Sequence, residues 1–143
     1  MDIKPDKFIG LRDAIVMGAI RNDCRDWMTS SAEYVSVAHQ IEWWKRNSGS
    51  VEAFLYFIDD APVGYGYARA DQERRVWLSG GLIETARGHG LGRQLFSHLS
   101  SSEQETWLEV LLTNHAARRI YERLGFRYVL QDERIATMKK SMS

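Results

Sequence analysis

The sequence predicts a single α/β domain over residues 1–143, and three observations support that fold class. Segments with the apolar pattern of strands alternate with segments that have the pattern of amphipathic helices. The chain is long enough to bury one core, and its 44% hydrophobic and 27% charged residues are ordinary for a globular protein. No internal repeat, low-complexity segment or linker interrupts it, so we expect one continuous domain.

The first half of the chain is expected to supply a strand, two helices and a hairpin. These elements are, in order, strand 8–12, helix 13–28, helix 37–45, strand 52–58 and strand 63–70. Ile41 and Trp44 are expected to face inward from the second helix. Asp59-Asp60-Ala61-Pro62 has the turn residues of a connection between the two hairpin strands.

The second half is expected to alternate between strands and helices. In order, the expected elements are strand 75–84, helix 91–99, strand 106–113, helix 114–124, strand 126–130 and strand 133–140. One face of the first helix carries apolar residues at helical spacing, namely Leu91, Leu95, Phe96 and Leu99. Asn114 is placed to cap the second helix and Gly125 to end it. The inward face of that helix is expected to hold Ala117, Ile120, Tyr121 and Leu124.

The turn between strand 75–84 and helix 91–99 reads Arg87-Gly88-His89-Gly90-Leu91-Gly92. Its alternating glycines leave backbone N–H groups unshielded at the positive end of a helix dipole, which suits a phosphate or diphosphate. Arg87 adds a full positive charge. A P-loop would need Gly-Lys-Ser/Thr, and a dinucleotide fingerprint would need wider glycine spacing. Taken alone, the motif therefore predicts an anion site, with a tight turn that binds no ligand as the alternative.

Two segments together resemble the GNAT superfamily of N-acetyltransferases. Residues 87–92 fit that family's Arg/Gln-x-x-Gly-x-Gly/Ala pyrophosphate loop. Residues 114–126, Asn-His-Ala-Ala-Arg-Arg-Ile-Tyr-Glu-Arg-Leu-Gly-Phe, are similar to its Asn-x-x-Ala…Tyr-x-x-x-Gly-Phe segment. One helix and one strand separate the two segments, as in the family. The resemblance covers residues 82–126 and implies a mixed, largely antiparallel sheet with helices on both faces.

The resemblance implies an acetyl-CoA-dependent N-acetyltransferase that passes the acetyl group directly to a primary amine. The residues expected to contact acetyl-CoA are Leu82, Ile83, Arg87, Gly88, His89, Gly90, Leu91, Gly92, Asn114 and Ala117. An N–H near Leu82 or Ile83 is expected to stabilise the oxyanion. Gly80-Gly81 is expected to mark a bulge that splays its strand from the next, with a simple weak point in the strand as the alternative. No acyl-cysteine intermediate is expected, because Cys24 lies far from both motifs in sequence and has no evident activating base.

Two kinds of group are needed to move protons in this reaction. Tyr121 stands where the family has its general acid, which protonates the departing thiolate. Its position on the apolar face of its helix makes a purely structural role the alternative. The amine must lose a proton before it attacks, and Glu84 is the first candidate for the base, followed by Glu109 or a chain of waters.

The acceptor is expected to be a small amine that lies in a cleft lined by Trp27, Tyr65 and Tyr67. Aromatic residues in the first helices faintly resemble those of amino-sugar acetyltransferases, so an amino sugar is one candidate, although such residues also commonly pack helices onto a sheet. One alternative is acetylation of a protein N-terminus or lysine, which needs an exposed groove. The other is a CoA-binding sensor without catalytic activity.

Charge, hydropathy and cysteine content narrow the remaining expectations. The formal net charge of zero predicts no nucleic-acid partner. The apolar runs are too short to span a membrane. The single cysteine excludes an internal disulfide and favours a reducing compartment, so we expect a cytoplasmic protein, either monomer or homodimer. The four histidines show no metal-ligand spacing, so no metal is expected.

Overall fold

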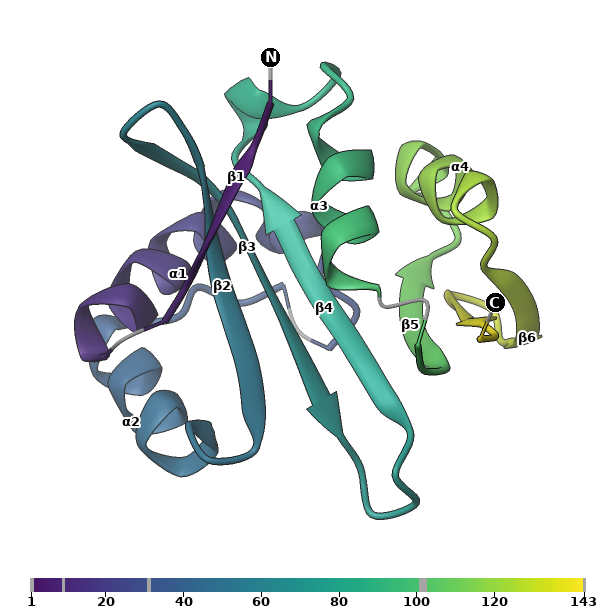
Figure 1. Ribbon diagram of the computed structural model, residues 1–143, viewed down its shortest axis with the longest axis horizontal. Helices are drawn as coiled ribbons and strands as arrows, with labels where there is room; N and C mark the ends of the chain where they lie inside the picture. The colour runs from purple at the N-terminus through teal and green to yellow at the C-terminus, as the bar shows by residue number, and fades with distance from the viewer. Residues whose placement is uncertain (1, 9, 31, 101–102, 143) are drawn as a thin grey trace.

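A mixed sheet runs through the computed structural model, which describes all residues except 1, 9, 31, 101–102 and 143 (Figure 1). In this part of the chain the strand order is β1-β2-β3-β4-β5-β7-β6. The strands are β1 (Lys4–Lys7), β2 (Val51–Ile58), β3 (Ala61–Ala70), β4 (Val76–Leu82), β5 (Thr106–Leu111), β6 (Arg127–Gln131) and β7 (Ile135–Lys140). Among the described strands only β4 and β5 are parallel neighbours, which confirms the expected mixed, largely antiparallel sheet.

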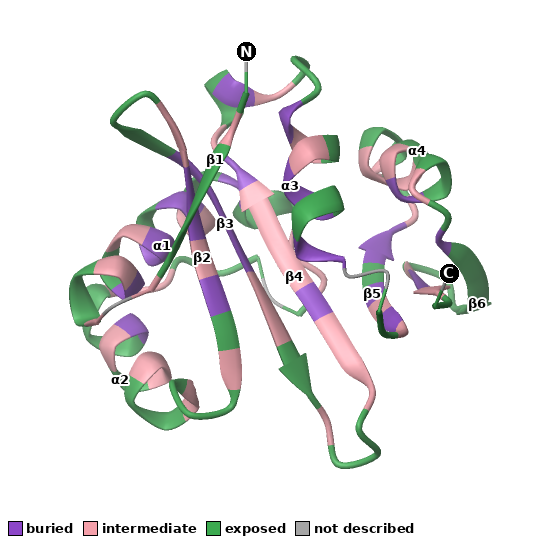
Figure 2. Cartoon of the chain, in the orientation of Figure 1, coloured by how far each residue is buried: buried purple, intermediate pink, exposed green. Residues whose placement is uncertain are grey.

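Helices cover both faces of the sheet, as expected. They are α1 (Leu11–Asp23), α2 (Val37–Asn47), α3 (Leu91–Leu99) and α4 (His115–Arg123), with two short 3₁₀ turns, η1 (Arg25–Trp27) and η2 (Glu84–Ala86). The larger core cluster lies between the sheet and α3 and α4, and a smaller cluster joins α1 and α2 to β2 and β3. The buried positions in Figure 2 follow the strands and the inward faces of these helices.

The second half of the chain folds as the sequence predicts. Each of the four apolar residues expected on the inward face of α3 is buried. Asn114 caps α4, because its side-chain oxygen accepts a hydrogen bond from the N–H of Ala117 at 3.3 Å. Gly125 ends the helix with a φ of 101°, and the N–H of Phe126 returns to the carbonyl oxygen of Tyr121 at 2.9 Å. This left-handed stop fixes where Tyr121 sits relative to the sheet.

The first strand and the start of α1 lie elsewhere than predicted. The predicted strand 8–12, whose residue 9 lies outside the described residues, is wrong, because β1 ends at Lys7 and α1 already begins at Leu11. The side chain of Asp13 accepts the N–H of Gly10 at 3.3 Å, which stabilises the first turn of the helix. A local cap therefore overrides the strand-like apolar pattern at this point.

Helix α1 also ends earlier than predicted, at Asp23 instead of residue 28. The N–H of Cys24 contacts the carbonyl oxygens of Ile20 and Arg21 at 3.2 and 3.1 Å, and the chain then turns into η1. Asn22 holds the returning loop through two hydrogen bonds to the backbone of Val35. As a result, residues 27–30 leave the helix and reach the middle of the sheet.

Helix α2 packs on α1 through a polar residue that the sequence did not indicate. Ile41 and Trp44, the predicted inward residues, are only half-buried, whereas Gln40 is buried. A side chain at Gly18 would meet Gln40 Cγ at 2.9 Å, so the two helices approach closely at this glycine.

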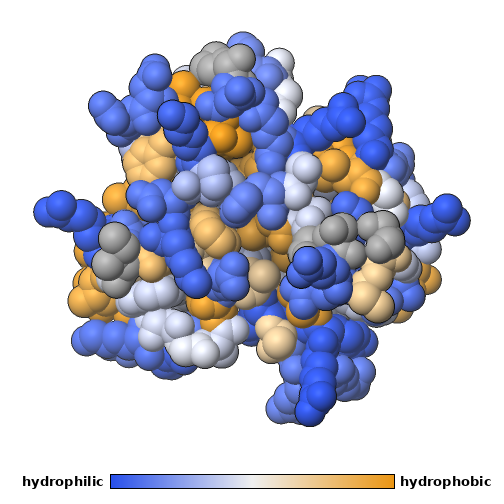
Figure 3. All heavy atoms as spheres, in the orientation of Figure 1, coloured by the Kyte–Doolittle hydropathy of each residue, from blue (hydrophilic) through white to orange (hydrophobic). Residues whose placement is uncertain are grey.

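Hydrophilic side chains dominate much of the face shown in Figure 3, with apolar groups between them.

Strands β4 and β5 pair only at their beginnings, through Val76 with Thr106 and Trp77 with Trp107. The predicted bulge at Gly80-Gly81 is wrong, because β4 keeps one register with β3 along its whole length. A Cβ at Gly80 would lie 2.7 Å from the carbonyl oxygen of Tyr65, and one at Gly81 would lie 2.7 Å from Cys24 Sγ. The two glycines thus admit close neighbours, while the strands separate without a bulge.

Candidate active site

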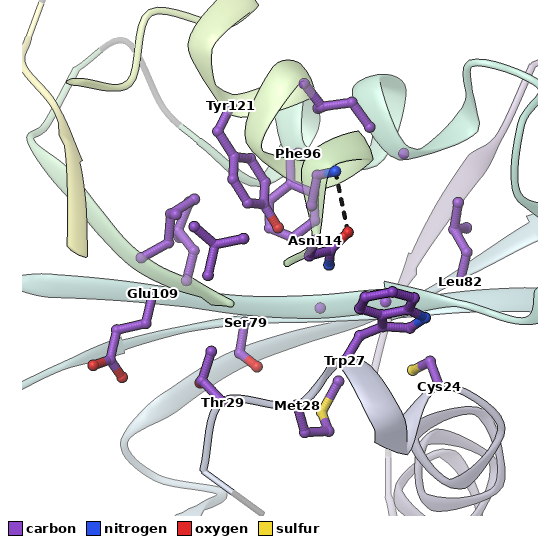
Figure 4. Close-up of a pocket in the computed structure, with 18 of the residues that line it drawn as sticks. Cys24, Trp27, Met28, Thr29, Ser79, Leu82, Phe96, Glu109, Asn114 and Tyr121 are labelled. Atoms are coloured by element: carbon purple, nitrogen blue, oxygen red, sulfur yellow. Dashed lines mark hydrogen bonds between the residues drawn. The ribbon is translucent and has the colours of Figure 1, made fainter. Parts of the chain in front are cut away.

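A cavity of about 780 Å³ lies where β4 and β5 part, which is within the usual size range of small-molecule sites. Figure 4 shows side chains on both sides of the strands. Phe96, Asn114 and Tyr121 lie on the side of α3 and α4. Trp27 and Thr29, from the loop after α1, lie toward the opposite side. The cavity therefore reaches both faces of the sheet.

The glycine turn presents its two ends to the cavity. Gly88 and Gly90 have φ angles of 81° and 77°, values that favour glycine, and Gly90 begins α3 without a side-chain cap. A Cβ at Gly92 would meet Ile120 Cδ1 at 3.1 Å, so this glycine lets α3 and α4 approach. The residues of the turn that line the cavity are Arg87, Gly88 and Gly92, whereas His89, Gly90 and Leu91 do not.

Arg87 carries an unused donor at this end of the cavity. Its Nε donates a hydrogen bond to the carbonyl oxygen of Leu82 at 3.3 Å. Its Nη2 is buried and has no hydrogen-bond partner among the described residues. A buried cationic N–H without a partner is costly, and an anion bound in the cavity would relieve that cost.

Leu82 and Ile83 direct their backbone N–H groups to opposite sides. The N–H of Ile83 donates to the carbonyl oxygen of Val63 at 2.9 Å. Because successive N–H groups of an extended chain alternate in direction, that of Leu82 points away from β3 and toward the gap. Leu82 lines the large cavity, and Ile83 lines a separate pocket of about 370 Å³. Only Leu82 is thus placed to donate into the cavity.

Tyr121 combines a packed ring with a hydroxyl that points into the cavity (Figure 4). Its ring lies edge-on to Phe96 and Phe126, with ring centroids 4.9 and 5.9 Å away. Burial raises the pKa of its phenol, so the group stays protonated and able to donate. Within the described part of the chain its hydroxyl has no hydrogen-bond partner. The ring packs as a core tyrosine does, while the hydroxyl remains available.

The two candidate bases lie in different places. Glu84 is exposed beside the smaller pocket, where its N–H donates to Asp23 Oδ2 at 2.6 Å. Glu109 lines the large cavity, and its carboxylate points to the α1 side of the sheet (Figure 4). Among the described residues that line this cavity, Glu109 is the only carboxylate. The structure therefore brings Glu109, and not Glu84, into the same cavity as Tyr121.

Of the three predicted acceptor-site residues, two line the cavity and the third is buried away from it. Trp27 and Tyr67 line the cavity. Tyr65 is only 1% exposed and does not line it, and its hydroxyl donates to Met28 Sδ at 3.5 Å. Asn114 and Ala117 line the opposite side of the cavity.

Several lining residues were missed from the sequence. They include Cys24, Met28, Thr29, Arg69, Trp77 and Ser79. Strand alternation could have identified Arg69, which shares a face of β3 with Tyr65 and Tyr67. The loop residues carried no comparable signal, because their position depends on where α1 ends.

Cys24 lies in the cavity wall although it is far from both motifs in sequence. Cys24 is 3% exposed, and its thiol donates to the carbonyl oxygen of Ile20 at 3.4 Å. Burial raises its pKa, which disfavours the thiolate that a nucleophile needs.

A hydrogen bond ties the loop after α1 to the far half of the sheet. Arg134 Nη2, in the turn between β6 and β7, donates to the carbonyl oxygen of Thr29 at 2.8 Å. The carbonyl oxygen of Arg134 accepts the N–H of Leu112 at 2.9 Å, which places this turn beside the end of β5. The loop thus passes from the β3–β4 half of the sheet to the β5–β7 half along one side of the cavity.

Neither a metal cluster nor a membrane span is found in the described ranges of the chain. Within them, no three His, Cys, Asp or Glu side chains gather as a metal site would require. Their helices are too short or too polar to cross a bilayer.

The family model of the acetyltransferase (GNAT) family matches residues 17–126. No curated protein matches the sequence significantly. Among solved structures, an N-acetyltransferase from Staphylococcus aureus Mu50 has a TM-score of 0.81 at 14% identity, with 100% of each chain covered.

Two further structures show how far acceptors differ on this fold. Spermidine N-acetyltransferase from Vibrio cholerae, in complex with CoA and spermine, has a TM-score of 0.76 at 15% identity, covering 99% of this chain and 96% of that one. RimL, a ribosomal L7/L12 alpha-N-protein acetyltransferase in complex with coenzyme A, has a TM-score of 0.75 at 11% identity, covering 99% and 95%. At these identities the likeness shows the fold alone.

Proposed function

Because the chain belongs to the acetyltransferase (GNAT) family, we propose that it transfers the acetyl group of acetyl-CoA directly to the primary amine of a small molecule. An amino sugar is one candidate acceptor. The observation that carries the proposal is the cavity between β4 and β5. It holds on one side of the sheet the hydroxyl of Tyr121, which has no partner among the described residues, and on the other the carboxylate of Glu109.

The α3 and α4 side of the cavity is the proposed site of acetyl-CoA. The diphosphate would be bound by backbone N–H groups of the turn from Gly88 to Gly92, at the N-terminus of α3, with Arg87 Nη2 as a charged donor. The pantetheine arm would follow the free edge of β4 beside Leu82, with Asn114 and Ala117 on its other side. The N–H of Ile83 already donates to the carbonyl oxygen of Val63, so this group is not free to bond the pantetheine arm.

The reaction then needs three events in one place. The neutral amine attacks the thioester carbon, a C–N bond forms, and the carbonyl oxygen becomes an oxyanion that the N–H of Leu82 stabilises. The C–S bond breaks as the oxyanion collapses, and the hydroxyl of Tyr121 donates a proton to the departing thiolate. Glu109, directly or through water, accepts the proton that the amine nitrogen loses, and water then returns a proton to the phenolate of Tyr121. Glu84 is less suitable as the base because it faces the smaller pocket.

Two observations favour a small acceptor over a protein. The loop that Arg134 ties at Thr29 occupies one side of the cavity, where a protein acceptor would need an open groove. The side of the cavity opposite α3 and α4, here called the acceptor side, is lined by the aromatic side chains of Trp27, Tyr67 and Trp77. The sensor alternative has no use for a buried phenol whose hydroxyl lacks a partner among the described residues, whereas the transfer reaction does.

The proposal is tested by thiol release from acetyl-CoA with a panel of small amines and with peptides that carry a free N-terminus or lysine. Tyr121→Phe keeps the packed ring, so kcat should fall by about 10²–10⁴-fold while acetyl-CoA affinity in calorimetry is retained. Tyr128→Phe is the matched control, because Tyr128 is exposed and its hydroxyl contacts only Arg118 and Glu122 among described residues. Unchanged kcat in Tyr121→Phe, or turnover of peptides alone, would contradict the proposal.

A further inference from the structure

Arg69 is a charged group at the acceptor side of the cavity that the proposed reaction does not use. It lies near the end of β3, is exposed, and lines the cavity. No hydrogen bond or ion pair to a described residue engages its guanidinium. Arg75 differs in this respect, since it pairs with Asp71 at 2.9 Å and with Glu73 at 3.3 Å. Arg69 is therefore free to meet a ligand.

The strand register places Arg69 and Glu109 on the same face of the sheet. Arg69 is opposite Trp77, which is opposite Trp107, and directly paired residues share a face. Glu109 follows Trp107 by two residues, so it also shares that face. From standard strand spacings, the Cα atoms of Arg69 and Glu109 are at least about 12 Å apart, because β4 and β5 separate beyond Trp77 and Trp107. Their side chains can close this distance around a small molecule that carries both charges.

The wall between the two charges is aromatic. Trp77 lies in the sheet between them, and Tyr67 and Trp27 also line this part of the cavity. The ring of Trp77 is held by Asp71, which accepts its indole N–H at 2.9 Å. Such rings suit an apolar body and the adjoining ammonium group.

The charge count argues against a polycationic acceptor. Glu109 is the only carboxylate among the described residues that line the cavity, and it shares the acceptor side with the cationic Arg69. A polyamine or a heavily aminated sugar would leave most of its ammonium groups without a counter-charge, and one of them close to an arginine. The carboxylate of Glu109 and the guanidinium of Arg69 instead match an acceptor that carries one positive and one negative group.

We propose that the acceptor is an amino carboxylate with an apolar side chain, such as a free amino acid. Its ammonium lies on Glu109 and its carboxylate on Arg69, whose planar guanidinium can bind both carboxylate oxygens. This inference rests on the proposed function and narrows its acceptor. Arg69 then determines specificity without contacting the atoms that react.

The test compares amines that differ only in the carboxylate: phenylalanine against phenethylamine, and leucine against isopentylamine, with glucosamine and spermidine as further acceptors. For the wild type, kcat/KM should favour each amino acid over its amine by about 10-fold or more, the range of a hydrogen bond to a charged group. Arg69→Gln should raise KM for the amino acids about 10-fold, with Arg69→Lys in between. It should leave KM for the amines and for acetyl-CoA unchanged.

Arg12→Gln is the matched control, since Arg12 is an exposed arginine on α1 that does not line the cavity. Equal use of phenylalanine and phenethylamine, a preference for glucosamine or spermidine, or an equal loss for all acceptors in Arg69→Gln would overturn this inference and leave the acetyltransferase proposal standing. Absence of thiol release with every amine and peptide would overturn both.

Discussion

The two sides of the gap between β4 and β5 are built in different ways. On the side of α3 and α4 the expected donors come from two segments, residues 82–92 and 114–121, and are mostly backbone N–H groups. The opposite side is assembled from side chains of the loop after α1, of β3, β4 and β5, and from the contact of Arg134. Backbone donors at a helix start recognise a constant group such as a diphosphate, whereas scattered side chains can change with the acceptor.

This difference explains which parts of the site could be predicted from the sequence. The glycine turn and the Asn114 to Gly125 helix carry local signals for conformation, so their structure was anticipated along with the position of Tyr121. The acceptor side depends on where α1 ends, and Asn22 holds that loop through contacts 13 residues away in the chain. No local pattern encodes such a contact. The order of Glu84 before Glu109 as the expected base rests on the position of Glu84 at the strand end beside the glycine turn, and the choice between them stays a prediction.

The fold shows the same division. Strands and helices after residue 75 were predicted within a few residues, because caps, glycines and strong apolar periodicity agree there. The early strand and the end of α1 were misplaced, since α1 is apolar on more than one face and therefore has a weak period. The bulge at Gly80-Gly81 was wrong because glycine in a strand also permits close packing, here against Cys24 and Tyr65.

The largest effect on activity should come from replacing Glu109, which lines the large cavity, and not Glu84, which lies beside the smaller pocket. Glu109→Gln removes the proposed base and should lower kcat/KM by about 10²–10⁴-fold. Acetyl-CoA affinity should be unchanged, because the carboxylate points to the other face. Glu84→Gln is the paired control and should retain activity. The opposite outcome in steady-state kinetics would return the base to Glu84.

A substitution in the glycine turn should affect only the cofactor side. Gly90→Val places a branched side chain at a φ of 77°, which distorts the turn, so acetyl-CoA affinity should fall about 100-fold or more by calorimetry. Gly49→Val is the control, because Gly49 has open space around it and no left-handed φ. Unchanged affinity in Gly90→Val would mean that the diphosphate binds elsewhere.

Arg134→Gln should affect only the acceptor side. It removes the hydrogen bond to Thr29, so the loop is held less firmly and KM for the amine should rise about 10-fold. The dissociation constant of acetyl-CoA should stay the same. Arg127→Gln, at an exposed position on β6, is the control. A matching loss of acetyl-CoA affinity would show that the two sides are not independent.

The smallest effect is on thermal stability, through the hydrogen bond by which Asp71 holds the ring of Trp77. Asp71 accepts hydrogen bonds from the indole of Trp77 and from Arg75 and Glu73, and these lower its pKa to about 2. Because the folded-state pKa lies below the unfolded value, the contribution to stability is present above about pH 4 and is lost as the pH falls toward 2.

The corresponding measurement is thermal unfolding of wild type and Asp71→Asn over this pH range. We expect Tm of the variant to be lower by a few degrees at neutral pH, and the two proteins to converge in acid. Asp60→Asn, in the exposed turn between β2 and β3, should follow the wild type at every pH. A gap that persists at pH 2 would assign the loss to packing instead of charge.

The short pairing of β4 with β5 also has a consequence for hydrogen exchange. Amides in the middle of a sheet normally exchange slowly, but β4 is joined to β5 through only two residue pairs. The N–H of Leu82 therefore faces a cavity, although its strand is central in the sheet order. In the free protein this amide should exchange at the rate of an edge strand. A bound thioester arm would protect it, so that the cofactor acts as the missing strand between the two halves of the sheet.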